Sequence, residues 1–163
     1  MKRKSSDKTT ERPSAYNKAL GLLVRREHSR RELRQKLDRS GYADDEACEA
    51  LDRLGQQHCQ DDDRFAEALI RNRSAQGYGP MRLRAELKSH GLPDARIRSL
   101  LESAQIDWTD SAAAQLRRRY GSAGTTDPAE RTRRAQFLLR RGFSAVTVRD
   151  VTHADVDAAD ASP

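Results

Sequence analysis

Apolar residues recur along this chain at every third or fourth position, from about residue 14 to residue 153. Leu33 and Leu37 are one helical turn apart, and so are Leu83 and Leu87. This period is typical of helices with one buried face. The aliphatic residues are mostly Leu and Ala, and the β-branched residues that strands favour are scarce. The pattern therefore predicts an all-α fold.

Capping residues predict where the first helices begin and end. Ser14 is expected to cap a helix that runs to about Arg26. Ser29 begins a Ser-x-x-Glu capping box with Glu32, and Asp44 is expected to cap the helix that follows. The inner face of that third helix is predicted to consist of Ala47, Ala50, Leu51 and Leu54.

Two later helix starts contain proline. Pro80 follows Gly79 at the position where a first helical residue is expected, because proline lacks the amide hydrogen that would be unpaired there. Asp127 precedes Pro128, and Glu130 is expected to complete a capping box. The run Asp61–Asp63 is interpreted as a helix N-terminus before Phe65, where carboxylates interact favourably with the helix dipole.

Three glycines are predicted to end helices in the left-handed conformation, which glycine adopts at little cost. Each one is followed by an apolar residue that folds back on the helix. The pairs are Gly41–Tyr42, Gly91–Leu92 and Gly142–Phe143.

These signals repeat along the chain. Leu33, Leu37 and Gly41 recur 50 residues later, and a third copy follows after another 51 residues with Arg134 at the position of Leu83. We therefore predict an elongated, curved array of three tandem three-helix repeats. The expected parts are a disordered basic tail (1–13), repeat 1 (14–60), repeat 2 (61–107), repeat 3 (108–153) and a loose acidic tail (154–163).

Basic residues are unevenly distributed. The chain has 31 basic and 25 acidic residues, which gives a net charge of +6. Repeat 1 has a net charge of +1, repeat 2 of zero and repeat 3 of +5. An excess of arginine indicates a nucleic-acid or acidic-protein partner, although solvated helix faces also show such charge.

The candidate binding surface consists of arginines that cluster in repeats 1 and 3, together with one arginine of repeat 2. These residues are Arg25, Arg26, Arg30, Arg31, Arg34, Arg82, Arg117, Arg118, Arg119, Arg131, Arg133, Arg134, Arg140 and Arg141. Arg133 and Arg140 are two helical turns apart and share a face, as do Arg134 and Arg141.

The sequence contains no recognisable catalytic arrangement. Its histidines (His28, His58, His90 and His153) have no useful mutual spacing, and the pair His58–Cys59 lacks the further ligands that structural zinc needs. Tyr78-Gly79-Pro80 is not a phosphate-binding loop, and the two cysteines indicate no disulfide framework. We expect no catalytic residue, metal or cofactor. We also expect no membrane partner and a cytoplasmic location, because no apolar run approaches the ~20 residues that span a bilayer.

Four segments in register resemble the RecX family, the bacterial regulators of the RecA recombinase. They are 29–42, 61–73, 77–92 and 137–143. The element GPxRLxxEL matches Gly79, Pro80, Arg82, Leu83, Glu86 and Leu87, and DxRFA matches Asp63, Arg64, Phe65 and Ala66. One departure is the segment from Leu54 to Cys59, which lacks the glycine of the LxxxGY pattern that is usual before DxRF.

The resemblance implies a non-enzymatic protein that binds the RecA–single-stranded-DNA filament. Separately, we expect a monomer, although the sequence leaves the oligomeric state open. Such a protein is expected to lie in the filament groove and to limit filament growth, ATP hydrolysis and strand exchange, with weaker direct binding to DNA. End-capping of the filament remains open as the mode of inhibition. The alternatives are a stand-alone DNA-binding protein with helix-turn-helix-like repeats, a scaffold and an enzyme.

Overall fold

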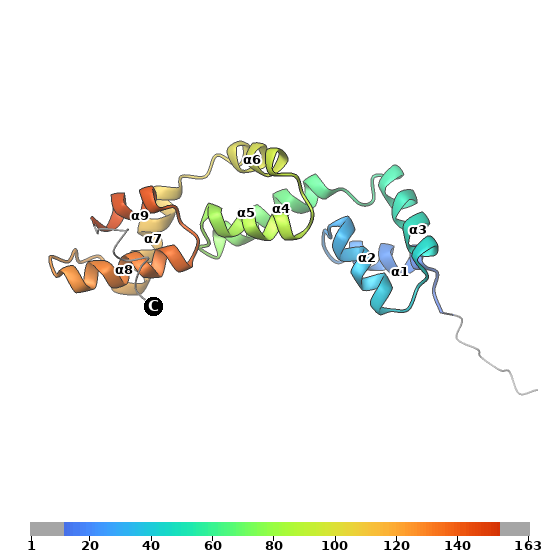
Figure 1. Ribbon diagram of the computed structural model, residues 1–163, viewed down its shortest axis with the longest axis horizontal. Helices are drawn as coiled ribbons and strands as arrows, with labels where there is room; N and C mark the ends of the chain where they lie inside the picture. The colour runs from blue at the N-terminus through green and yellow to red at the C-terminus, as the bar shows by residue number, and fades with distance from the viewer. Residues whose placement is uncertain (1–11, 154–163) are drawn as a thin grey trace, which may run out of the picture. The chain divides into compact units, whose positions relative to one another are not determined.

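Nine α-helices and no strand make up residues 12–153, the part of the chain that the computed structural model describes (Figure 1). The all-α prediction is confirmed. The helices follow one another in groups of three: α1 (Ala15–Leu23), α2 (Arg30–Arg39), α3 (Asp44–Gln56), α4 (Asp62–Ala75), α5 (Pro80–Ser89), α6 (Asp94–Ser103), α7 (Trp108–Tyr120), α8 (Pro128–Arg140) and α9 (Ala145–Thr152). The chain divides into two compact units, and the boundary along the sequence lies between residues 61 and 62.

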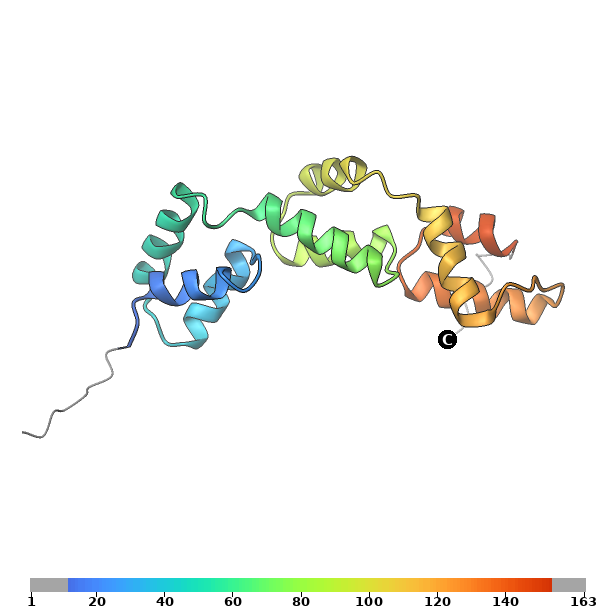
Figure 2. The same ribbon diagram turned by 180° about the vertical axis from the view of Figure 1, so that it is seen from behind.

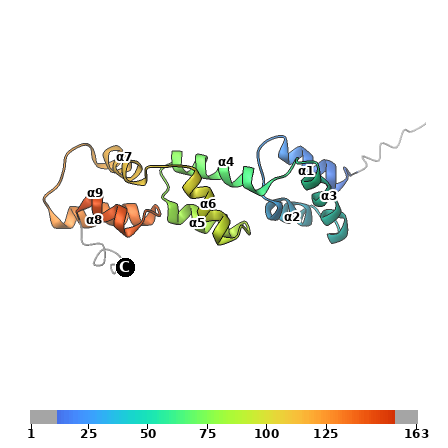
Figure 3. The same cartoon turned by 90° about the horizontal axis from the view of Figure 1, so that it is seen from above.

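The first unit contains α1, α2 and α3 around one small core (Figure 3). Helices α1 and α2 both pack against α3. Leu33 and Leu37 of α2 are fully buried, and Leu51 and Leu54 of α3 face them in the same cluster. The predicted inner face of α3 is confirmed, since Ala47 and Ala50 are buried as well.

The second unit contains two cores in one compact body. Helices α4–α6 enclose a core that includes Leu83 and Leu87, and α7–α9 enclose a core that includes Leu138 and Phe143. Trp108 packs against both clusters. Because it is the only tryptophan of the chain, its fluorescence reports on the second unit alone.

The predicted leucine stripe and glycine stops are confirmed. The leucines at matching positions (Leu33, Leu37, Leu83, Leu87 and Leu138) are all 0% exposed. The φ angle is +78° at Gly41, +93° at Gly91 and +85° at Gly142. Tyr42, Leu92 and Phe143, the residues that follow, are all buried.

His58 also has a positive φ, of +55°. It stands in the segment where the LxxxGY pattern has its glycine, so the departure seen in the sequence places a side chain in a left-handed conformation. The turn is nevertheless closed by backbone hydrogen bonds, including one from the Cys59 amide to the Leu54 carbonyl at 2.9 Å. A non-glycine residue in this conformation costs about 1–2 kcal/mol.

Most predicted caps are confirmed. The side chains of Ser14, Ser29 and Asp127 accept hydrogen bonds from backbone amides in the first turns of α1, α2 and α8. Pro80 is the first residue of α5, after Gly79. The carboxylates of Asp62 and Asp63 lie in the first turn of α4, as the dipole argument predicted.

Three local predictions are wrong. Helix α1 ends at Leu23 and not at Arg26, because the following amides turn back to nearer carbonyls, as Arg25 does to Leu22. Asp44 is the first residue of α3 and not its cap, because its carboxylate instead pairs with an arginine of α2.

The capping box at α8 is incomplete. Glu130 accepts hydrogen bonds from Thr125 and Arg134, whereas the Asp127 amide donates to the Thr125 hydroxyl. Glu130 therefore holds the preceding loop and α8 together by side-chain contacts.

The predicted tails lie outside the described residues, except for Arg12 and Pro13. Arg12 donates to the carbonyls of Ser40 and Gly41 and stacks on Tyr42, and the Tyr42 hydroxyl donates to the Pro13 carbonyl. These two residues of the predicted N-terminal tail therefore contact the first unit. None of the described helices is long and apolar enough to cross a membrane.

Candidate functional site

The candidate arginines of the first unit are mostly paired with carboxylates. Three of them make ion pairs, with these nitrogen–oxygen distances: Arg26–Glu32 (2.5 Å), Arg30–Asp52 (2.5 Å) and Arg34–Asp44 (2.8 Å). Arg25 and Arg31 are exposed, and no carboxylate among the described residues pairs with them. Carboxylates therefore neutralise three of the five candidate arginines of this unit.

Glu32 also contacts a buried histidine, His28. His28 is 3% exposed, and its Nδ1 lies 3.0 Å from the Glu32 carboxylate. Burial lowers the pKa of His28, and the carboxylate offsets only part of that effect. Burial alone would raise the pKa of Glu32, but hydrogen bonds from Arg26 and His28 outweigh it and hold that pKa below its usual value. This cluster is a structural link between α2 and the turn before it.

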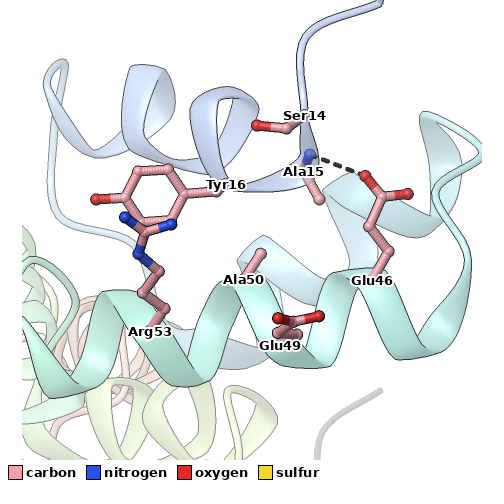
Figure 4. Close-up of a pocket in the computed structure, with 7 residues that line it drawn as sticks. All are labelled: Ser14, Ala15, Tyr16, Glu46, Glu49, Ala50 and Arg53. Carbon is pink, nitrogen blue, oxygen red and sulfur yellow. Dashed lines mark hydrogen bonds between the residues drawn. The ribbon is translucent and has the colours of Figure 1, made fainter.

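A shallow pocket in the first unit has mixed charge (Figure 4). Its wall includes Glu46 and Glu49, and the Arg53 guanidinium lies 4.5 Å from the Tyr16 ring centroid. Glu46 accepts a hydrogen bond of 3.2 Å from the Ala15 amide, at the start of α1. Two carboxylates against one stacked arginine do not suit an anionic ligand, so this pocket is not a candidate site.

In the second unit, the backbone of the α8–α9 loop caps α5. The Gly79 amide donates to the Arg141 carbonyl at 2.8 Å, and the Met81 amide donates to the Gly142 carbonyl at 2.9 Å. Figure 2 shows the turn before α5 beside the loop after α8. We name this contact the Gly79–Gly142 joint. It explains how Gly79, which has no side chain that could accept a capping hydrogen bond, can stand at the N-cap position of α5.

Glycine is required on both sides of the joint. A Cβ atom at Gly79 would lie 2.3 Å from the Gly142 carbonyl oxygen, and one at Gly142 would lie 2.5 Å from the Arg82 Cβ. The Arg141 side chain adds hydrogen bonds of 3.0 and 3.2 Å to the carbonyls of Gln76 and Gly77. The two helix groups of the second unit are therefore held together through backbone atoms.

Arginines and aromatic rings alternate across this joint. The Tyr78 ring centroid lies 4.3 Å from the Arg82 guanidinium carbon and 5.5 Å from that of Arg141. The Phe137 centroid lies 5.1 Å from Arg141 and 4.9 Å from Arg119. We name the series Arg82, Tyr78, Arg141, Phe137, Arg119 and Tyr120 the arginine–aromatic ladder.

The last ring of the ladder, Tyr120, lies 5.6 Å from Arg119 and meets Phe137 edge-on at a centroid distance of 5.9 Å. Arg82 and Arg119 are exposed and Arg141 is half-buried. Among the described residues, no carboxylate pairs with these three arginines. Their guanidinium planes are held by rings, and rings do not use up the N–H donors.

The remaining candidate arginines of the second unit fall into two groups. Arg131 and Arg134 donate to the carbonyls of Thr125 and Ala123, and the Arg134 side chain is only 11% exposed. These two hold the loop before α8. The others are exposed: Arg117, Arg118, Arg133 and Arg140. Arg117 and Arg133 have carboxylates only at long range, 3.7 and 3.8 Å away.

Sequence reasoning missed the rings of this surface. Tyr78, Phe137 and Tyr120 were not candidates, because aromatic residues alone predict burial more often than binding. Tyr78 did have a signal: it stands inside the glycine pair Gly77 and Gly79, where a close backbone approach is expected. The partner in that approach lies more than 60 residues away and could not be named.

No group of three or more potential metal ligands occurs among the described residues. Neither Cys48 nor Cys59 forms a disulfide. The Arg34 guanidinium lies 2.9 Å from the Cys48 sulfur, a contact within the α2–α3 packing.

Three family models match consecutive parts of the chain. They describe the first, second and third three-helix domains of RecX and match residues 15–54, 61–101 and 105–152. Each range covers nearly all of one helix triplet, and the first two ranges end two residues before α3 and α6 do.

Curated relatives and solved structures agree with these matches. The chain is 48% identical over 140 residues to the regulatory protein RecX of Xanthomonas axonopodis pv. citri (strain 306). The aligned residues make up 86% of both chains. It is 47% identical, with the same coverage, to the regulatory protein RecX of Stenotrophomonas maltophilia (strain K279a). A crystal structure of RecX from Lactobacillus salivarius has the same fold, with a TM-score of 0.69 at 22% identity over 88% of this chain and 95% of that one.

Proposed function

Because this chain belongs to the RecX family of regulatory proteins, we propose that it regulates the RecA recombinase, mainly as an inhibitor. It binds in the groove of the RecA–single-stranded-DNA filament. It limits filament growth, ATP hydrolysis and strand exchange. It does so by binding alone, without a catalytic residue or cofactor, and acts in the cytoplasm, where the filament forms.

The construction of the second unit best supports this proposal. Backbone hydrogen bonds join its two helix triplets, and several of its arginines have no carboxylate partner among the described residues. A filament presents the same protein and DNA surfaces again and again. Separate basic surfaces on one chain can then bind several subunits at once, so modest individual contacts give a high overall affinity. Bridging neighbouring subunits obstructs the rearrangements that filament activity needs.

A second candidate is a stand-alone DNA-binding protein. Guanidiniums with unused donors favour it, because they bind phosphate whether or not RecA is present. The two candidates differ in what the protein needs as a target: a filament for the regulator, and bare DNA for the alternative.

The test measures RecA-dependent ATP hydrolysis and strand exchange at increasing concentrations of this protein. Binding to the same DNA without RecA is measured in parallel by fluorescence anisotropy. We expect inhibition at concentrations that leave free DNA largely unbound. Inhibition that begins only when the free DNA is coated would favour the stand-alone DNA-binding protein.

A further inference from the structure

We propose that the arginine–aromatic ladder is the part of this protein that faces DNA, and that it binds the phosphodiester backbone of a single strand. The inference rests on the proposed function and deepens it, since it separates DNA contacts from protein contacts on the candidate surface. The occupant is single-stranded DNA because that is the nucleic acid of the filament on which the protein is proposed to act.

The first support is the state of the guanidiniums. Arg82, Arg141 and Arg119 stack on rings at 4.3 to 5.5 Å and have no carboxylate partner among the described residues. A stacked guanidinium loses much of its side-chain freedom before a ligand arrives. The in-plane donors of Arg82 and Arg119 stay available, whereas the Arg141 Nη1 already donates to the carbonyls of Gln76 and Gly77. Both features favour bidentate binding of a phosphate.

The second support is the contrast with the arginines at the ends of the series. Arg73 also approaches Tyr78, at 6.0 Å, and Arg134 approaches Tyr120, at 5.1 Å. Both bind carboxylates: Arg73 binds Glu86 at 2.6 Å and Arg134 binds Glu130 at 2.5 Å. The carboxylates thus hold the outer arginines. Arg82 and Arg119 keep their donors for a phosphate, and Arg141 keeps those that its bonds to Gln76 and Gly77 do not use.

The third support concerns the aromatic rings of the ladder, against which guanidiniums already lie. Phe137 is 9% exposed, Tyr78 and Tyr120 are half-buried, and guanidiniums lie against all three. Guanidiniums therefore compete with bases for the ring faces of the ladder. The contact is with phosphates, so binding is independent of sequence and falls with salt.

The experiment uses the full chain without RecA. A labelled mixed-sequence oligonucleotide and a duplex of the same length are titrated by fluorescence anisotropy at several salt concentrations. The variant is Arg82→Gln with Arg119→Gln. Its control is Arg71→Gln with Arg98→Gln, two exposed arginines of the same unit for which the structure shows no ring contact. Circular dichroism and Trp108 fluorescence verify that both variants fold.

We expect the ladder variant to bind the single strand at least about 10-fold more weakly at moderate salt, and the control to change by less than about 2-fold. The slope of log affinity against log salt should become shallower by about 1.4, since each phosphate contact on a single strand contributes roughly 0.7. Replacement by lysine, Arg82→Lys with Arg119→Lys, should retain only part of the affinity, because lysine does not form the bidentate contact.

Several outcomes overturn the inference. Equal losses in the ladder and control variants, or full affinity in the lysine variant, would mean that charge alone matters. A loss confined to the duplex would contradict the single strand as occupant. The ladder variant is also tested in the RecA inhibition assay described under the proposed function. Unchanged DNA binding together with weakened inhibition there would place the ladder against protein, and the proposed function would survive. Absence of RecA inhibition by the unmodified protein would instead contradict the proposed function itself.

Discussion

The two units of this protein differ in how several of their candidate arginines are held. In the first unit Arg26, Arg30 and Arg34 bind carboxylates of their own helix triplet. In the second unit Arg82 and Arg119 lie against aromatic rings and have no carboxylate partner among the described residues. A paired arginine must give up its partner before it can bind a phosphate, whereas a stacked one need not. The number of arginines in a repeat therefore says less about binding than their neighbours do.

The units also differ in how their parts are held. The first unit has a single core, whereas the second has two cores that share Trp108 and meet at the Gly79–Gly142 joint. This difference makes the units separately testable. Trp108 fluorescence follows the second unit, and circular dichroism follows both.

The largest effect on stability is expected from the leucine stripe. Leu87→Ala should lower the free energy of unfolding of the second unit by roughly 2–5 kcal/mol, because the side chain is fully buried. Leu37→Ala, at the matching position of the first unit, should cost a similar amount there. Urea unfolding should show Leu87→Ala shifting the Trp108 transition and Leu37→Ala leaving it in place. A Trp108 transition that moves equally in both variants would mean that the units unfold as one.

The next largest effect on stability is expected at the Gly79–Gly142 joint. Gly79→Ala should cost about 2–3 kcal/mol in the Trp108 transition, because the new Cβ meets a backbone carbonyl that cannot move aside without shifting α8. Gly124→Ala, in the loop before α8 of the same unit, is the matched control, since nothing lies within 4 Å of its Cβ position. That change should be neutral or stabilising by up to about 1 kcal/mol. Equal stability in the two variants would show that the joint contributes nothing.

The exposed end of α7 should dominate the electrostatic part of binding. Changing Arg117, Arg118 and Arg119 to Glu should raise the concentration needed for RecA inhibition by about 10-fold or more, with a weaker dependence on salt. Folding should survive, because all three residues are exposed.

The comparison variant for that change carries Glu at Arg25, Arg31 and Arg39 of the first unit, which are equally exposed. It makes the same change in net charge and should weaken inhibition much less. Equal inhibition by the two triple variants would remove the functional difference between the units.

The smallest effect concerns the left-handed residue of the first unit. His58→Gly should stabilise that unit by about 1 kcal/mol, because glycine adopts a φ of +55° without the cost that histidine bears. Urea unfolding followed by circular dichroism measures the gain, and the Trp108 transition should stay unchanged. A loss of stability would show that contacts of the His58 side chain outweigh the backbone cost.

The sequence by itself determined the helices, most of their caps and the inner leucines. Ser14, Ser29, Pro80, Asp127 and the three glycine stops act within one or two turns of chain, so their signals are complete in a short window. One failed prediction had a tertiary cause, because Arg34 of the preceding helix pairs with the Asp44 carboxylate. The end of α1 and the capping box at Glu130 failed through contacts within a few residues.

Only the tertiary structure decided which arginines are paired and which are stacked. Arg141 meets the carbonyls of Gln76 and Gly77 across more than 60 residues, and Arg119 meets Phe137 from another helix. Such contacts depend on how helices pack, and residue spacing along one helix says nothing about them. The sequence therefore determined where positive charge is abundant. Packing determined where that charge is neutralised and where its hydrogen-bond donors stay available to a partner, because a guanidinium binds whichever carboxylate, ring or carbonyl the fold brings nearest.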